Sequence, residues 1–281
     1  MVMWFRPWAP QHRMVDGHRL AYVRCGTGDP LILVHGITTS SFIWDDLLPI
    51  LNVHHDVIAV DLLGTGASDR PVPSDCSLSA HADRVISLID QLGFGKIHLV
   101  GHDIGGGIAQ IFSVRNADRV STLGLVNSVG YDYWPVQPIV ALRTPILRQL
   151  AMASLDLGML RLVIRRAVHR RERITPVIFE RIRNEIAIPT SRRAFLNSTR
   201  CLNNSDLTTI SDQLPKLGMP VLIVRGERDL YLSPEISKRL HHEIPSSKLV
   251  TVPDGGHFIQ LDEPQLLAAT ILDHIRESRH G

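Results

Sequence analysis

A strand that turns directly into a helix, with a carboxylate at the turn, is the feature that most limits how this chain can fold. The segment "KIHLVGHDIGGGIAQIFSVRN" (96–116) contains an apolar run that stops at Gly101, then Asp103, then three consecutive glycines and a helical pattern. Glycines permit so tight a turn because neighbouring Cβ atoms would clash there. Asp103 is therefore either a carboxylate that caps the helix or a nucleophile.

The rest of the chain repeats this alternation of strand and helix patterns. Short runs rich in Val, Ile and Leu, each ended by a turn residue, predict strands, and longer runs with apolar residues at helical spacing predict helices. Strands that alternate with helices indicate a mostly parallel sheet with helices on both faces. The predicted strands lie at 19–26, 30–36, 56–64, 96–101, 121–129, 219–229 and 247–257, and the predicted helices at 79–94, 105–120 and 264–279.

Between residues 131 and 214 the strand patterns disappear and helical patterns replace them. The predicted architecture is an α/β core domain, residues 1–130 and 215–281, interrupted by a helical cap of residues 131–214 that is inserted after the sixth strand. The cap segment contains thirteen arginines and seven acidic residues. Such a surplus is typical of solvated helix faces, and an anion-binding site is the alternative.

Composition excludes several classes of function. The net charge of +2 over 281 residues is too small to indicate nucleic acid. Three isolated cysteines form no disulfide or zinc pattern, which favours a reducing cytoplasm. No stretch reaches the roughly 18 apolar residues of a membrane span, and the N-terminus lacks a signal-peptide pattern. We expect a cytoplasmic monomer or homodimer that acts on a small molecule and needs no cofactor and no metal.

Chemically capable residues follow the predicted strands in a fixed order. Ligands of a parallel sheet collect beyond the carboxyl ends of its strands, and those ends carry Asp103, Asp229 and His257. Asp229 is the predicted acid, and Glu227 and Asp132 are its rivals. A nucleophile, an acid and a histidine base therefore occur in that order along the chain.

These markers resemble the α/β-hydrolase fold, whose enzymes place a nucleophile between glycines on a strand-to-helix elbow and continue with acid and His. The resemblance covers nearly the whole chain: "HG" at 35–36, "DLLGTGASDRP" at 61–71, the elbow, "RGERD" at 225–229 and "GGHFIQLDEP" at 255–264. Aspartate at the elbow resembles the branch with haloalkane dehalogenases, fluoroacetate dehalogenases and epoxide hydrolases.

That branch implies a specific mechanism. Asp103 would attack a saturated carbon and form an alkyl ester, which water activated by His257 would then hydrolyse. Asp229 would orient His257, and the backbone N–H groups of Ile37 and Ile104 would form the oxyanion hole. Attack on an ordinary carboxylic ester would instead produce an anhydride.

The leaving group is less defined by the sequence. Related dehalogenases hold halide with side chains at positions that are here Ile37 and Ile104, and neither side chain can donate a hydrogen bond. Epoxide hydrolases use cap tyrosines as acids, and Tyr131 and Tyr133 stand near the start of the cap. Trp134 is an alternative donor to a halide.

The sequence thus favours an epoxide hydrolase for a largely apolar substrate of small to medium size. A dehalogenase with a non-standard halide site is the alternative. Two further alternatives are an esterase or lactonase and a non-catalytic ligand-binding protein.

Overall fold

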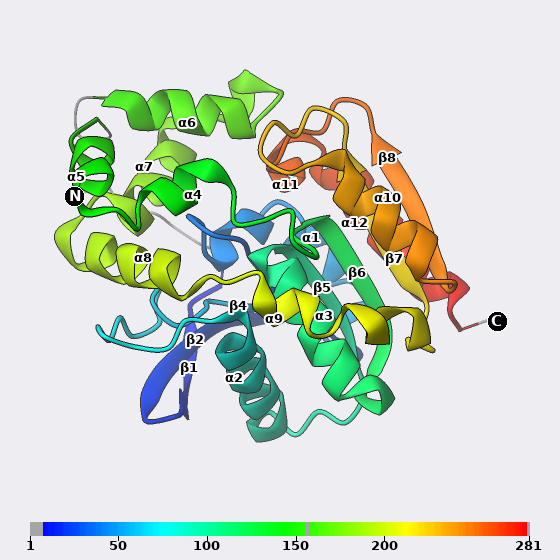
Figure 1. Cartoon of the computed structure of the whole chain (residues 1–281). Coiled ribbons are helices and arrows are strands. Elements are labelled where there is room, and N and C mark those ends of the chain that lie inside the picture. The colour runs from blue at the N-terminus through cyan, green and yellow to red at the C-terminus, as the bar shows by residue number, and fades with distance from the viewer. Residues whose placement is uncertain (1–7, 155–157, 280–281) are drawn as a thin grey trace.

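The computed structural model describes residues 8–154 and 158–279, and within them eight strands form one sheet (Figure 1). The strand order is β1-β2-β4-β3-β5-β6-β7-β8. β2 pairs antiparallel with both of its neighbours, β1 and β4, and all the other pairs are parallel. The strands are β1 (Gln11–Val15), β2 (His18–Cys25), β3 (Asp29–Val34), β4 (His55–Val60), β5 (Ile97–Asp103), β6 (Val120–Ser128), β7 (Val221–Gly226) and β8 (Ser247–Val252). The expected α/β-hydrolase fold is confirmed.

The central strands are apolar along their whole length because helices cover both faces of the sheet. In β3, Ile32 and Val34 face one hydrophobic cluster, whereas Leu31 and Leu33 face the other. The first cluster includes side chains of α2 (Leu78–Gln91), α3 (Ile104–Arg115) and α10 (Pro234–Glu243). The second includes those of η1 (Ser41–Trp44), α1 (Leu48–Leu51), α11 (Ile259–Asp262) and α12 (Pro264–Glu277). The two clusters pack the sheet from both sides, and because its strands are mostly parallel, their carboxyl ends lie at one edge.

Between β6 and β7 the chain forms five consecutive α-helices that lie over this edge, and we call them the cap (Figure 1). They are followed by α9 (Ser205–Thr208) and η5 (Ser211–Lys216), which contact core helix α3. Leu207 and Leu214 of these two short helices belong to the first hydrophobic cluster. The cap helices are α4 (Gln137–Ala141), α5 (Pro145–Ser154), α6 (Leu160–Ala167), α7 (Pro176–Ile186) and α8 (Pro189–Cys201).

No helix among the described residues is long and apolar enough to cross a membrane. The first seven residues, on which much of the signal-peptide expectation depends, lie outside the described part of the chain.

A buried carboxylate joins the cap to the core. Glu185 of α7 accepts hydrogen bonds from the backbone N–H of Gly66 at 3.1 and 3.2 Å, and Arg70 lies 3.5 Å away. Burial is the main cause that raises the pKa of Glu185 to about 7, and nearby Asp61 adds to it. The cap is therefore attached to the loop after β4 by a group that titrates near neutral pH.

We expect Glu185→Gln to stabilise the fold at pH 8 and to have little effect at pH 4.5. The pKa of a free glutamate is lower than that of folded Glu185, so the wild type loses stability as pH rises from about 4.5 to about 7. That difference corresponds to roughly 3 kcal/mol at most. Thermal unfolding of both proteins at the two pH values measures it, and an equal change at both would contradict the titration of Glu185.

Candidate active site

Asp103 lies at the strand-to-helix elbow in a strained backbone conformation. Its φ of 54° and ψ of −120° are unusual for a residue with a Cβ, and such strain clusters at functional sites. A Cβ on Gly101 would come within 2.1 Å of the carbonyl oxygen of Gly105, and one on Gly105 within 2.4 Å of that of Val34. Asp103 forms no side-chain capping hydrogen bond with α3. The elbow therefore presents the carboxylate to the cavity above the sheet.

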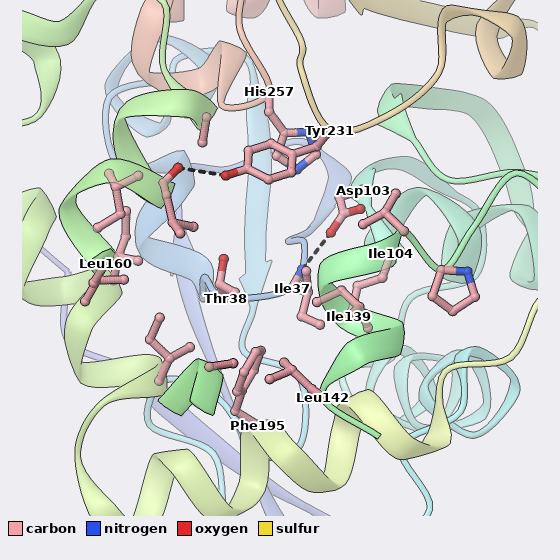
Figure 2. Close-up of a pocket in the computed structure, with 18 of the residues that line it drawn as sticks. Ile37, Thr38, Asp103, Ile104, Ile139, Leu142, Leu160, Phe195, Tyr231 and His257 are labelled. Carbon is pink, nitrogen blue, oxygen red and sulfur yellow. Dashed lines mark hydrogen bonds between the residues drawn. The ribbon is translucent and has the colours of Figure 1, made fainter. Parts of the chain in front are cut away.

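Two backbone amides act on the Asp103 carboxylate. The N–H of Ile37 donates to Oδ2 of Asp103 at 2.9 Å (Figure 2), and the N–H of Ile104, the next residue in the chain, helps to lower the pKa of this carboxylate. The loop before Ile37 is tied to the loop after β4, since His35 Nε2 accepts a hydrogen bond from the N–H of Leu62. The Ile37 amide is thus aimed at an oxygen that would carry negative charge during hydrolysis of an Asp103 ester.

His257 and Asp229 form a buried pair beside this carboxylate. Nδ1 of His257 lies 3.0 Å from Oδ2 of Asp229. Oδ1 of Asp229 accepts from the N–H groups of Tyr231 and Leu232 at 2.8 and 3.2 Å. The rival acids Glu227 and Asp132 are exposed. This geometry gives Asp229 the position of the acid and leaves Nε2 of His257 available for a proton transfer.

Burial and charge act against each other in this group. Burial raises the pKa of Asp103, while His257 and the two amides oppose that rise. Burial alone would lower the pKa of His257, but Asp229 and Asp103 outweigh it and the pKa is raised. For Asp229, burial acts upward, yet His257 and Arg225 lower its pKa to about 2. Asp229 is therefore ionised at any working pH and stabilises a protonated His257.

Sequence reasoning missed the residues that hold the catalytic loops together. The Asn127 side chain donates to the carbonyl oxygens of Gly256 and His257 at 2.8 and 3.0 Å, and accepts from Gly226 at 2.9 Å. Buried Arg225 pairs with Asp229 at 3.1 Å. Both lie near the carboxyl ends of their strands, Asn127 in β6 and Arg225 in β7, but neither has a motif that separates it from an ordinary strand residue. Asn127 thus connects the acid loop to the base loop.

Asp103 and His257 line a cavity of about 240 Å³ between the core and the cap. Figure 2 shows the cap side chains Ile139, Leu142, Leu160 and Phe195 around the space into which Asp103 points. The other walls are also largely apolar: Val129, Val136, Met152, Met159, Val163, Ile164, Ile182, Ile186 and Leu202. Among the described residues no cluster of His, Cys, Asp and Glu could hold a metal ion. The cavity fits an apolar molecule with one polar reacting group.

The structure corrects the predicted donors of the cap. Tyr131 turns away from the cavity, because its hydroxyl donates to Glu243 of α10 at 2.8 Å, and Tyr133 is 41% exposed. Neither lines the cavity. Trp134 does line it, and its buried indole N–H has no partner among the described residues.

A tyrosine outside the cap lines the cavity instead. Of the four tyrosines, all of which the structure describes, only Tyr231 lines the cavity. Its ring lies 5.4 Å from that of His257, and its hydroxyl donates to the carbonyl oxygen of Val163 at 2.8 Å (Figure 2). Burial raises its pKa to about 12, so the hydroxyl keeps its proton at neutral pH. The sequence signal that could have identified Tyr231 is its position two residues after Asp229, in the loop of the predicted acid.

Comparison with known proteins agrees with this fold. The chain is 29% identical to haloalkane dehalogenase 2 of Mycobacterium tuberculosis (strain ATCC 25618 / H37Rv) over 267 residues, 91% of each protein. It is 36% identical to a soluble epoxide hydrolase of Corynebacterium sp. (strain C12), over 41% of this chain and 40% of that protein.

Solved structures resemble it along nearly the whole chain. An α/β hydrolase fold protein from Burkholderia ambifaria superposes with a TM-score of 0.85 and 27% identity, covering 94% of this chain and 97% of the other. The model of the alpha/beta hydrolase family matches residues 31–270. The chain therefore belongs to the α/β hydrolase family.

Proposed function

We propose that the protein is a cofactor-free hydrolase in which Asp103 forms an alkyl ester with the substrate. One observation carries this proposal: the carboxylate at the elbow has one oxygen held by the Ile37 amide and lines an apolar cavity together with His257. A carboxylate is nucleophilic without a general base near neutral pH. His257 is then free to serve the second half of the reaction.

With an epoxide as substrate, the proposed reaction has two steps, formation of the Asp103 ester and its hydrolysis. The second oxygen of Asp103 attacks a ring carbon, the carbon–oxygen bond breaks, and the ring oxygen takes a proton. Nε2 of His257 then removes a proton from water, and the resulting hydroxide attacks the ester carbonyl. The oxyanion rests on the Ile37 and Ile104 amides. Collapse breaks the ester carbon–oxygen bond, and the alkoxide takes the proton held by His257 and leaves as the diol. The proton left on Asp103 returns to the group that protonated the ring oxygen, which restores the Asp103 carboxylate.

Esterification changes the electrostatics in favour of the second step. Asp103 is one of the two carboxylates that raise the pKa of His257. Its negative charge disappears once it carries the alkyl group, so the pKa of His257 falls. The base becomes neutral when it has to accept a proton from water, while Asp229 remains to stabilise the cation that forms.

We propose an epoxide as the substrate class, and Tyr231 as the donor to the opening ring oxygen. Its hydroxyl is protonated at neutral pH, and its ring lines the cavity 5.4 Å from the ring of His257. Its hydrogen bond to the Val163 carbonyl has to be exchanged for one to the substrate. The soluble epoxide hydrolase of Corynebacterium, which resembles part of this chain, supports the assignment.

Halide displacement is the second candidate, and Trp134 is the observation that favours it. An indole N–H is a good donor to an anion, and that of Trp134 is buried without a partner among the described residues. The haloalkane dehalogenase 2 of Mycobacterium tuberculosis, similar over 91% of the chain, is consistent with this chemistry.

The intact mass of His257→Gln tests both candidates. The variant is exposed separately to 1,2-epoxyhexane and 1-bromohexane, and an ester on Asp103 should form and persist because the water is not activated. A gain equal to the whole epoxide supports ring opening, whereas a gain of a hexyl group with bromide release supports dehalogenation. The double variant Asp103→Ala/His257→Gln is the control and should gain nothing. No adduct from either reagent would contradict the nucleophile.

We expect Tyr231→Phe to slow adduct formation from 1,2-epoxyhexane roughly 10²-fold, which is the usual contribution of a general acid. Bromide is a stable anion that needs no proton, so Tyr231→Phe should leave the reaction of 1-bromohexane nearly unchanged. Rapid-quench mass spectrometry in the His257→Gln background measures the rates. Tyr133→Phe, at an exposed tyrosine, is the matched control. Equal rates for Tyr231→Phe and the control would rule out Tyr231 as the donor.

A further inference from the structure

The cap contains a second cavity, of about 280 Å³, that is separate in its lining from the catalytic one. It lies between α6 and α7, two neighbouring helices of the cap (Figure 1). Arg161 and Arg165, one turn apart on α6, form one side of it. Arg171, from the short helix η4 (Arg171–Arg173), also lines it. Three arginines, all exposed at the surface, therefore line one hollow.

Within residues 8–154 and 158–279, none of the guanidinium groups of these three arginines has a hydrogen bond or an ion pair with a carboxylate. Two nearby arginines of the same region do pair with acids, Arg170 with Glu263 and Arg181 with Asp45. Like charges gathered in a concave site repel one another, and an anion placed between them would relieve that repulsion.

A single carboxylate lines the same hollow. Glu180 of α7 is there, but its Oε2 is engaged by Arg183 at 2.9 Å. Three positive charges therefore face one acid that already has a partner. The hollow has a net positive charge, and a neutral ligand would leave that charge without compensation.

The remaining walls are apolar and partly aromatic. Ile174, Pro176 and Phe179 complete the lining, and the guanidinium of Arg161 lies 5.2 Å from the centre of the Phe179 ring. That contact holds the Arg161 group by a cation–π interaction and leaves its N–H donors free. A simple ion would use only the charged side of such a site, whereas a ligand with an aromatic or alkyl body would use both.

We propose that this hollow binds an organic anion, a phosphate monoester or a carboxylate attached to an aromatic or alkyl body. Guanidinium groups match the paired oxygens of such anions, and Phe179 with Ile174 accommodates the apolar part. The site does not depend on the proposed hydrolase reaction. It shares helix α6 with the catalytic cavity, because Leu160, Ile164 and the Val163 carbonyl that holds Tyr231 belong to the same helix.

Isothermal titration calorimetry with phenyl phosphate tests the site. We expect saturable binding of one equivalent to the wild type, weaker binding of inorganic phosphate, and weakening of both in high salt. Arg161→Gln/Arg165→Gln should bind phenyl phosphate about tenfold more weakly or worse, because charge-assisted hydrogen bonds are lost. Arg193→Gln, at an exposed arginine of α8, is the matched control and should bind like the wild type. Circular dichroism checks that both variants are folded.

Hydrogen exchange locates the bound ligand. Phenyl phosphate should slow amide exchange in peptides that cover 160–180 and leave those around Asp103 and His257 unchanged. The proposal is overturned by absence of saturable binding to the wild type, or by equal affinities of the wild type and the double arginine variant. Protection at the catalytic loops instead of α6 and α7 also overturns it, as does equal affinity for phenyl phosphate and neutral benzyl alcohol.

Discussion

Replacing Asp103 with alanine is expected to reduce turnover of an epoxide roughly 10⁴-fold or more, the scale at which removal of a nucleophile acts. The Ile37 amide holds one oxygen of the carboxylate, and in the proposed mechanism the other oxygen forms the covalent intermediate, which alanine cannot provide. Steady-state turnover of 1,2-epoxyhexane, with diol measured by gas chromatography, gives the ratio. Alanine also has a Cβ, so the steric strain of the positive φ at this position should be similar in the variant and the wild type.

The matched control is Asp132→Ala. Asp132 is an exposed aspartate in the loop after β6, and the sequence leaves it open as an acid. Its replacement should change turnover less than twofold, because surface changes away from a site have small effects. Activity of Asp103→Ala within tenfold of the wild type would rule out the ester mechanism. It would also rule out Asp103 as the nucleophile for either an epoxide or a haloalkane.

The core of the fold and the Asp103, Asp229 and His257 group could be predicted because both depend on local signals. Each residue follows a short apolar run that forms a parallel strand, and parallel strands bring their carboxyl ends to one edge. The glycines at the elbow add a steric demand that only a tight turn explains. Their positions after predicted strands were therefore enough to predict that the three residues meet, although Asp103 and His257 are 154 positions apart in the chain.

The donors of the cavity could not be predicted in the same way, because they depend on side-chain direction. Tyr131 stands beside Trp134 in sequence, yet its backbone has a φ of 55° and its hydroxyl reaches Glu243 of α10. Tyr231 enters the cavity because the turn after Asp229 is fixed by two amides on Oδ1. Tertiary contacts between distant segments decide both directions, and no periodic pattern records them.

The attachment of the cap shows the same limit. Glu185 is one charged residue in an arginine-rich helical segment, where the plain interpretation is a solvated face. The structure instead buries it against the Gly66 amide, 119 positions away. The charged residues of this segment therefore differ in their surroundings. Glu185 is buried where the cap meets the core, whereas three arginines line the hollow between α6 and α7.

The second large effect is expected from Asp229→Asn, which should slow hydrolysis of the Asp103 ester roughly 10³- to 10⁴-fold. Asparagine cannot stabilise the protonated form of His257, and it also allows the ring to adopt the wrong tautomer. Formation of the ester should be affected far less, since His257 has no part in that step. Single-turnover mass spectrometry separates the two rates, and the ester should accumulate in Asp229→Asn but not in the wild type.

The pH profile of the same variant distinguishes this electrostatic role from a merely structural one. His257 accepts a proton only in its neutral form, so ester hydrolysis rises with pH through the pKa of His257. Asp229 raises that pKa, and its removal must shift the rise to lower pH even as the maximal rate falls. Asp229→Glu keeps the charge and should keep the wild-type position of the rise. The control Glu227→Gln, at the exposed neighbour, should change neither rate nor profile. A slow Asp229→Asn variant with an unshifted profile would mean that Asp229 serves the loop and not the proton.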